Sequence, residues 1–303
     1  MSSDVATSTS AVDTYRAMYT AREFDDVTIA LQRQGAVAGY APARGQEASH
    51  VGVASQLGPE DMLFPSYRQP GAGLVMGVTP QELWRFHGRY SYTPWDWRQR
   101  RFFTYTIPVG SQLAHAVGWA IEQRHRGAET VSVVFFGDGA SSQGEVHEAM
   151  NMAGVFSAPT VFVCENNGWA ISLPTARQTA ASSLYVRALG YGFAGQRVDG
   201  NDVSAVQTAV SGAIARARAG FGPTLLELET YRLGPHTTSD DPGLYRSEAT
   251  VEGRRLRDPV VAERRRLVTD VGLADDEVDE IENSVEAELR VAAAEYLQEV
   301  GDE

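Results

Sequence analysis

The sequence contains no lysine, because all 26 of its basic residues are arginines. Enzymes that bind pyridoxal phosphate through a lysine Schiff base are therefore excluded. A phosphate-binding P-loop, which needs a lysine to contact the phosphates, is excluded for the same reason. The chain is therefore neither an enzyme that binds pyridoxal phosphate through lysine nor a lysine-dependent P-loop protein.

Cysteine is also scarce, since Cys164 is the one cysteine of 303 residues. A disulfide within the chain is impossible, which fits a reducing compartment. Cys164 ends an apolar run, so we expect it to be a small core residue. The first residues, MSSDVATSTSAVD, are small and polar and do not resemble a signal or transit peptide. We expect a disordered tail over residues 1–12 and a cytoplasmic location.

An excess of positive charge and long apolar runs are also absent from the sequence. The chain has 39 acidic residues against 26 basic ones, a net charge of −13. The basic surface of a nucleic-acid-binding protein is therefore absent, and we expect no nucleic-acid partner. No apolar run approaches the roughly 18 residues that suggest a membrane span, so we expect no membrane partner.

Strand-like and helix-like patterns alternate along the chain. Apolar strands are predicted near 131–137, 160–167 and 223–233, and helices near 12–35, 46–57 and 203–220, with a further helix between the first two strands. The alternation predicts an α/β fold with a mainly parallel sheet covered by helices on both faces. We expect residues 13–303 to form a single domain. Residues 89–106 mix aromatics and arginines without a period, and we expect a loop that covers the surface.

Two of the predicted helices carry specific signals. Thr79 followed by Pro80 is typical of a helix start, with a side-chain cap and a proline in the first turn. In the helix after residue 140, apolar residues recur on one face, which we expect to be buried. These residues are Val146, Ala149, Met150 and Ala153.

The stretch GDGASSQGEVHEAMNMAGVFSAPTVFVCENNG, residues 137–168, predicts a strand, a helix and a second strand. In a right-handed crossover, Asp138 and Asn167 would lie at the same edge of the sheet. A carboxylate, an amide oxygen and backbone carbonyls suit Mg²⁺. Gly137 and Gly139 allow close approach of the backbone, and the following helix presents amide groups to an anion. The stretch therefore predicts a site for a magnesium diphosphate.

The spacing of GDG, 26 further residues and NN resembles the thiamine diphosphate motif. The resemblance extends to the α subunit of the E1 component of 2-oxoacid dehydrogenase complexes, of branched-chain or pyruvate type. It implies the three-layer thiamine-diphosphate-binding fold. The segments that carry it occur in family order; they are YRAMYTAREFDD, RGQEASHVGVASQL, FPSYRQPG, IPVGSQLAHAVG, GDG to NNGWAIS, TYRLGPHTTSDDPGLYR and RDPVVAERRRL.

The resemblance implies a role for each of eleven residues. Mg²⁺ would be held by the Asp138 and Asn167 side chains and the Trp169 carbonyl. The diphosphate would contact Tyr67, Arg68 and the backbone amides of Gly139 and Ala140. The aminopyrimidine and its pocket would be lined by Ile107, Val109 and Ile171.

His236 occupies the position of the family's active-site histidine. The resemblance implies that it holds a phosphate oxygen or assists proton transfer during acylation of the lipoyl group. A histidine that titrates near the working pH suits either role. The other histidines, at positions 50, 87, 115, 125 and 147, we expect to be structural or exposed.

The implied reaction is oxidative decarboxylation of a 2-oxoacid, with acyl transfer to a lipoyl-bearing E2 protein. Branched-chain substrates are favoured by TTSDDPGLYR, and pyruvate is the alternative. In this family a β subunit supplies the glutamate that activates the cofactor, so the resemblance implies an α2β2 enzyme that is active only when assembled. The family's GR-x-MP-x-H segment is not matched here.

Two other interpretations stay open at this point. One is a subunit of a thiamine-diphosphate transferase, like a split transketolase. The other is a non-catalytic binding or scaffolding subunit that has kept the fold. The segments SYR and PHTTSDD favour the dehydrogenase, and intact Asp138, Asn167, Arg68 and His236 argue against a scaffold.

Overall fold

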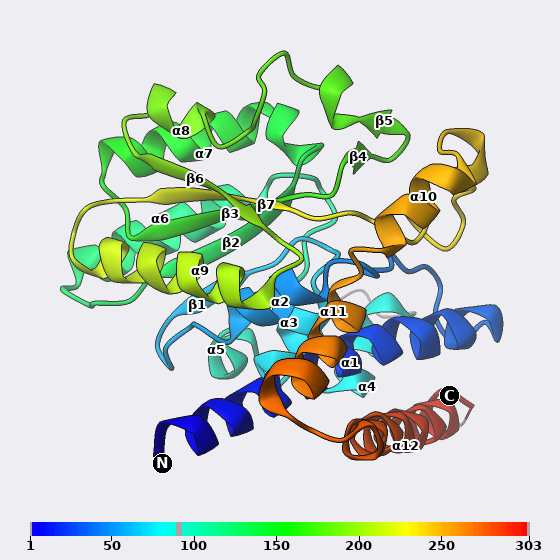
Figure 1. The fold of residues 1–303 in the computed structure, drawn as a ribbon. Helices are drawn as coiled ribbons and strands as arrows, with labels where there is room; N and C mark the ends of the chain where they lie inside the picture. The colour runs from blue at the N-terminus through cyan, green and yellow to red at the C-terminus, as the bar shows by residue number, and fades with distance from the viewer. Residues whose placement is uncertain (1, 89–92, 302–303) are drawn as a thin grey trace.

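A computed structural model describes residues 2–88 and 93–301, and these form a five-stranded sheet in which every pairing is parallel (Figure 1). The strand order is β1-β2-β3-β7-β6. The strands are β1 (Met62–Phe64), β2 (Ser132–Gly137), β3 (Thr160–Asn166), β6 (Ala194–Asp199) and β7 (Thr224–Glu229). A separate short hairpin pairs β4 (Trp169–Ala170) with β5 (Leu173–Pro174). The predicted parallel sheet is confirmed.

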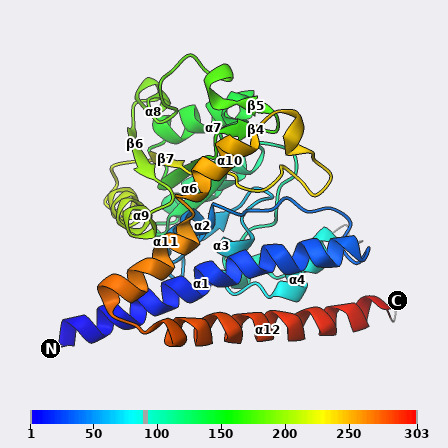
Figure 2. The same ribbon diagram turned by 45° about the vertical axis from the view of Figure 1, so that its right-hand side comes forward.

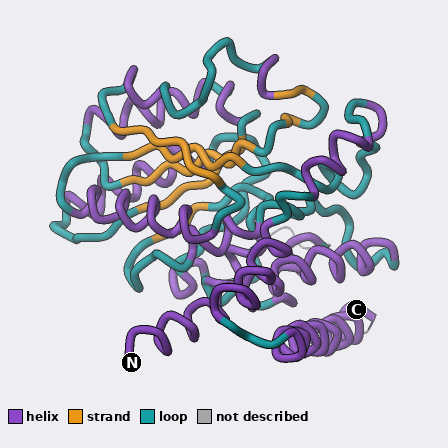
Figure 3. The backbone as a smooth tube through the Cα atoms, viewed as in Figure 1, coloured by secondary structure: helices purple, strands orange, loops and turns teal. Residues whose placement is uncertain are grey.

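Helices cover both faces of this sheet, which lies between them in Figure 3. One core contains Val133, Phe135 and Val163, and the other contains Val134, Phe136 and Phe162, because successive strand residues point to opposite faces. Helices α6 (Gln112–His125), α7 (Gly144–Val155) and α8 (Arg187–Gly190) pack on the second face. Helix α9 (Val203–Arg218) packs on the first. The α/β three-layer prediction is confirmed.

The other helices lie mostly on the α9 side of the sheet (Figure 1). They are α1 (Ser2–Arg33), α2 (Glu47–Ala54), α3 (Pro70–Val75), α4 (Pro80–His87), α5 (Trp97–Arg100), α10 (Glu248–Arg255), α11 (Pro259–Arg266) and α12 (Asp275–Gly301). Figure 2 shows α12 lying along α1, where Tyr19 donates a hydrogen bond to Glu286. Within the described ranges, no helix combines the length and the apolar character needed to cross a bilayer.

Both specific helix predictions are confirmed. The Thr79 side chain accepts a hydrogen bond from the Glu82 amide, and the Glu82 carboxylate accepts one from the Thr79 amide, so α4 begins with a complete capping box. In α7 the buried residues are the four predicted ones, Val146, Ala149, Met150 and Ala153. Cys164 is also buried, in the core.

The predicted disordered tail, residues 1–12, is wrong at its C-terminal end. Helix α1 begins at Ser2, and Ala11 is already buried in a cluster with Tyr15 and Met18. Small residues such as Ala11 give a weak sequence signal, yet alanine is the best helix former and extends a helix that packing has already nucleated.

The predicted surface loop over 89–106 is also wrong where the structure describes it; residues 89–92 lie outside the described residues. Trp95, Phe102 and Tyr105 are buried, and the Trp95 indole donates a hydrogen bond of 2.9 Å to the Phe102 carbonyl. The Leu63 amide donates to the Arg101 carbonyl, which attaches the segment to β1. Large aromatic side chains bury enough area to fix an irregular segment in the core, so periodicity does not detect it.

Candidate active site

The carboxyl ends of β2 and β3 place Asp138 and Asn167 at the same edge of the sheet. The two strands pair in parallel, with Gly137 opposite Glu165. A cavity of about 280 Å³ lies at this edge. Ten of the eleven predicted site residues line it: Tyr67, Arg68, Val109, Asp138, Gly139, Ala140, Asn167, Trp169, Ile171 and His236. Ile107 does not line it and is 60% exposed.

Asp138 is a buried carboxylate at this edge. Its Oδ2 atom accepts hydrogen bonds from Thr175 Oγ1 at 2.9 Å and from Gln178 Nε2 at 2.7 Å. Burial raises the pKa of the Asp138 carboxyl, while these two hydrogen bonds act in the opposite direction. A cation in the cavity would stabilise the ionised carboxylate.

Asn167 is oriented by a neighbouring glutamine. Its amide nitrogen donates to Gln46 Oε1 at 3.1 Å, and its Oδ1 accepts from the Trp169 amide at 3.3 Å. The Trp169 carbonyl oxygen lies 3.4 Å from Nη1 of Arg232. Gln46 Nε2 is buried and has no hydrogen-bond partner among the described residues, so the site holds an unused donor.

Two guanidinium groups flank His236. Its Nδ1 atom lies 2.9 Å from Arg68 Nη2 and 3.3 Å from Arg232 Nη1. Because both neighbours can only donate, the imidazole accepts at Nδ1 and keeps its proton on Nε2. Within the described ranges, neither arginine forms an ion pair with a carboxylate. Paired arginines without a counter-charge are suited to binding an anion such as a diphosphate.

The predicted titration of His236 near working pH is wrong in this arrangement. Burial, followed by the charges of Arg68 and Arg232, lowers its pKa to about 4. The imidazole is therefore neutral at pH 7. The backbone amide of His236 donates to Asp240 Oδ2 at 2.8 Å, which fixes the loop that carries it.

Gly139 lets the β4–β5 hairpin pack against the GDG turn. A Cβ atom at Gly139 would lie 2.7 Å from Cβ of Ala170, closer than carbon atoms approach, whereas one at Gly137 would have nothing within 4 Å. The hairpin turn contains Ile171 at φ 55°, a left-handed conformation that is costly for a β-branched residue. The Ile171 carbonyl accepts from Arg232 Nη2 at 2.8 Å, which helps to hold this turn.

A buried polar cluster in the wall of the cavity is absent from the sequence prediction. The Glu165 carboxylate accepts from Gln69 Nε2 at 2.7 Å and from the Ser49 hydroxyl, and it lies 3.2 Å from Nε2 of His50. His50 is thus structural, as predicted. Burial raises the pKa of the Glu165 carboxyl, but these contacts together outweigh it, and the net shift is downward. Glu165 directly precedes the NN pair, a position that could have drawn attention to it.

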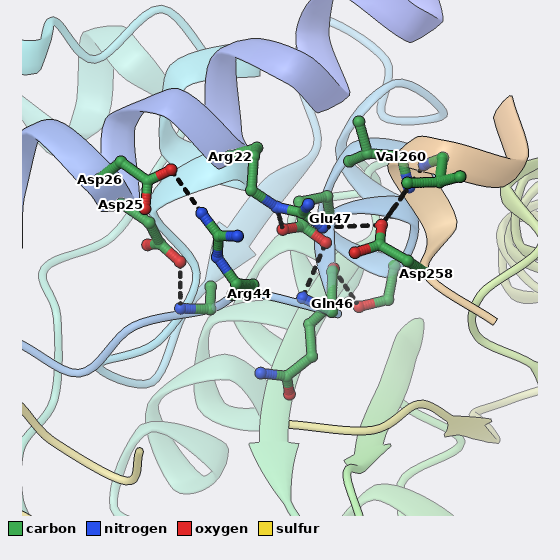
Figure 4. Close-up of polar contacts among 12 residues, drawn as sticks. Arg22, Asp25, Asp26, Arg44, Gln46, Glu47, Asp258 and Val260 are labelled. Atoms are coloured by element: carbon green, nitrogen blue, oxygen red, sulfur yellow. Dashed lines mark hydrogen bonds and ion pairs between the residues drawn. The ribbon is translucent and has the colours of Figure 1, made fainter. Parts of the chain in front are cut away.

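Gln46 is supported by an ion-pair network on its other side. Figure 4 shows Arg22 between Glu47 and Asp258, with the Gln46 side chain pointing away from this group. Arg22 Nε donates to Glu47 at 2.5 Å and Arg22 Nη2 to Asp258 at 2.9 Å. The network joins α1, α2 and the start of α11 behind the residue that orients Asn167.

The described residues contain no cluster of three or more His, Cys, Asp or Glu side chains that could hold a metal ion. The predicted Mg²⁺ ligands are of another kind, namely one carboxylate, one amide oxygen and one backbone carbonyl. Oxygen donors of this kind match the preference of Mg²⁺, which usually keeps several water ligands and takes phosphate oxygens.

Comparison with known proteins identifies relatives over most of the chain. The 3-methyl-2-oxobutanoate dehydrogenase subunit alpha of Mycobacterium tuberculosis is 48% identical over 258 residues, which are 84% of this chain and 69% of the relative. The 2-oxoisovalerate dehydrogenase subunit alpha of Bacillus subtilis is 38% identical over 281 residues, 89% of this chain and 85% of the relative. The mitochondrial 2-oxoisovalerate dehydrogenase subunit alpha of Bos taurus is 36% identical over 273 residues, 87% of this chain and 60% of the relative.

These relatives confirm the resemblance to E1 α subunits that the sequence motifs indicate. E1 components in general use thiamine diphosphate, and E1 α subunits work in a complex with a β subunit and an E2 protein. The model of the "Dehydrogenase E1 component" family matches residues 15–300. The chain therefore belongs to the dehydrogenase E1 component family.

Proposed function

We propose that this chain is the E1 α subunit of a branched-chain 2-oxoacid dehydrogenase complex. Assembled with its β subunit, it would take part in oxidative decarboxylation of the 2-oxoacid and transfer of the acyl group to lipoyl-E2. Relatives named for 3-methyl-2-oxobutanoate and 2-oxoisovalerate support the branched-chain substrate. The observation that best supports cofactor binding here is that four side chains line one cavity: Asp138, Asn167, Arg68 and Arg232. Among the described residues, neither arginine forms an ion pair.

The cavity residues fit magnesium and thiamine diphosphate. Mg²⁺ would be held by the Asp138 and Asn167 side chains and the Trp169 carbonyl. The diphosphate would be held by side chains and backbone amides that face the same space: those of Tyr67, Arg68, Gly139, Ala140 and His236, to which the structure adds Arg232. The uncompensated guanidiniums and the unused Gln46 amide support this fit. Thiamine diphosphate, when bound, supplies the electron sink for decarboxylation.

His236 would act on the diphosphate as a neutral hydrogen-bond donor. Its Nδ1 accepts from the two arginines, so Nε2–H is the group left to donate to an anion. A bound diphosphate would offset the two positive charges and so raise the pKa of His236. In that state the imidazole becomes able to hold and release a proton.

The partner proposal is a β subunit in an α2β2 assembly, which supplies the activating glutamate. Three apolar side chains predicted at the cofactor are exposed in this chain: Ile107, Val109 and Ile171, at 60, 43 and 55%. Exposed apolar side chains beside a cofactor cavity support a site that is completed by another chain. Residues 13–303 as one domain, and a cytoplasmic location, stay predictions.

The test is co-expression with the β subunit and an assay of 2-oxoacid-dependent reduction of an artificial electron acceptor. Pyruvate, 2-oxobutyrate and the branched-chain 2-oxoacids are compared. Activity should require both chains, thiamine diphosphate and Mg²⁺, and should be highest with branched-chain acids. Equal inactivity on all of them with the cofactor bound would contradict the dehydrogenase, and ketol transfer to an aldose would favour a transketolase-like enzyme.

A further inference from the structure

Asp138 is a buried carboxylate without a cationic partner. It is 1% exposed, and in the part of the chain that the structure describes it forms no ion pair. A buried carboxylate requires either an opposite charge or hydrogen-bond donors. Asp138 has two neutral donors, and both of them bond to the same oxygen, Oδ2. No side chain of the described residues donates a hydrogen bond to its Oδ1.

The two donors come from one short segment that follows β5. The Thr175 amide donates to the Gly168 carbonyl at 3.0 Å, and Gln178 Nε2 donates to the Leu173 carbonyl at 3.0 Å. The Thr175 hydroxyl also lies 3.0 Å from Asn166 Oδ1. Asn166 in turn donates to the buried carboxylate of Glu227 at 2.8 Å. The segment is therefore fixed at the ends of β3 and β7.

We infer that Thr175 and Gln178 are positioning residues that hold Asp138 so that it binds the metal through one carboxylate oxygen. They hold Oδ2 through hydrogen bonds, so Oδ1 is left to bind the cation. Carboxylates that bind metals are commonly fixed in this way by hydrogen bonds from a surrounding group of residues. The inference rests on the proposed Mg²⁺ site and assigns roles to two residues outside it.

Gln178 contributes more than Thr175. The Gln178 amide carries two protons, one for Leu173 and one for Asp138. The Thr175 hydroxyl carries one proton for two neighbouring acceptors, Asp138 Oδ2 and Asn166 Oδ1. Its hydrogen bond to Asp138 is therefore shared, whereas that of Gln178 is not. We expect the larger loss of metal affinity when Gln178 is changed.

The test measures Mn²⁺ binding to the complex with the β subunit at saturating thiamine diphosphate, through the electron paramagnetic resonance of free Mn²⁺. Gln178→Met and Thr175→Val each remove one donor. Thr175→Ser keeps the hydroxyl, and Thr179→Val changes a neighbouring threonine that does not contact Asp138. Loss of one donor should raise the Kd for Mn²⁺ about 10-fold or more. Saturating Mn²⁺ should restore occupancy.

The outcomes separate this inference from the proposed function. Native Mn²⁺ affinity in both donor-removing variants, with affinity lost in Asp138→Ala, overturns the positioning role and leaves the metal site in place. Native affinity in Asp138→Ala contradicts the metal site itself, and with it the positioning role. If Gln178→Met does not assemble, the comparison of Thr175→Val with Thr175→Ser provides the same test.

Discussion

The two glycines of the GDG turn should respond differently to alanine. A Cβ atom at Gly139 would lie 2.7 Å from Cβ of Ala170, whereas one at Gly137 would meet nothing within 4 Å. The Gly139 backbone has φ −61° and ψ −40°, which alanine adopts without strain. The cost of Gly139→Ala is therefore steric, and it should displace the hairpin that carries Trp169 and Ile171.

The size of the effect follows from two opposing contributions. Overpacking at a tight contact costs about 1–3 kcal/mol of unfolding free energy. Replacing glycine by alanine in an unstrained conformation stabilises the folded state by about 0.4–1 kcal/mol, because it reduces the conformational entropy of the unfolded chain. Gly139→Ala should thus destabilise by about 1–2 kcal/mol, and Gly137→Ala should be neutral or slightly stabilising.

The assay is urea and thermal unfolding of the complex with the β subunit, together with calorimetric binding of Mg²⁺ and thiamine diphosphate. Gly139→Ala should weaken binding, and Gly137→Ala is the matched control for the unfolding measurements. Ala170→Gly removes the opposing methyl group, so the double variant should recover stability, with a coupling energy of about 1–2 kcal/mol. The reasoning is refuted if the two glycine variants behave alike and Ala170→Gly rescues nothing.

Three further predictions concern single residues. Ile171→Asn should gain about 1 kcal/mol in stability, because asparagine tolerates the left-handed conformation at φ 55°, and should weaken cofactor binding measured by calorimetry. Burial raises the pKa of Asp25 to about 7, against 3.8 when unfolded. The folded state thus retains a proton that the unfolded state releases, so the contribution of Asp25 to stability should fall from about pH 4 to 7. The stability of the native protein relative to Asp25→Asn, measured by unfolding at pH 5 and pH 8, should be lower at pH 8. His236, with a pKa of about 4 against 6.5 when unfolded, contributes stability that is present above pH 6.5 and is lost as the pH falls towards 4. An NMR titration should report this low pKa, and pyrophosphate should raise it; a value near 6.5 without ligand would contradict the described contacts with the two arginines.

The parallel sheet and most of the cavity follow from the sequence because local patterns encode them. Strand runs such as 132–137 are continuously apolar, and the crossover rule brings their ends together. Asp138 and Asn167 could therefore be paired without knowing any tertiary contact. Their spacing also resembles a family motif. That resemblance allowed roles to be predicted for residues far away in the chain.

The supporting contacts could not be predicted, because they join residues that no local pattern connects. Glu165 meets Gln69 and Ser49 from separate helices or loops, and Arg22 meets Asp258 across 236 positions. The pKa of His236 was predicted wrongly for the same reason. Its shift depends on burial and on Arg68, which lies 168 positions away in the sequence and so approaches only in the folded chain. Buried aromatics near 95–105 likewise lack any period that a sequence pattern could report.

The site assignment also predicts how the cavity is filled in the assembled enzyme. Crystals of the complex with the β subunit, thiamine diphosphate and Mn²⁺ would show the metal directly through its anomalous scattering. The predicted peak lies between the side-chain oxygens of Asp138 and Asn167, within bonding distance of the Trp169 carbonyl, with the diphosphate against Arg68 and His236. A metal peak elsewhere, or a diphosphate that contacts neither residue, would contradict the central claim that this cavity binds the cofactor's magnesium diphosphate.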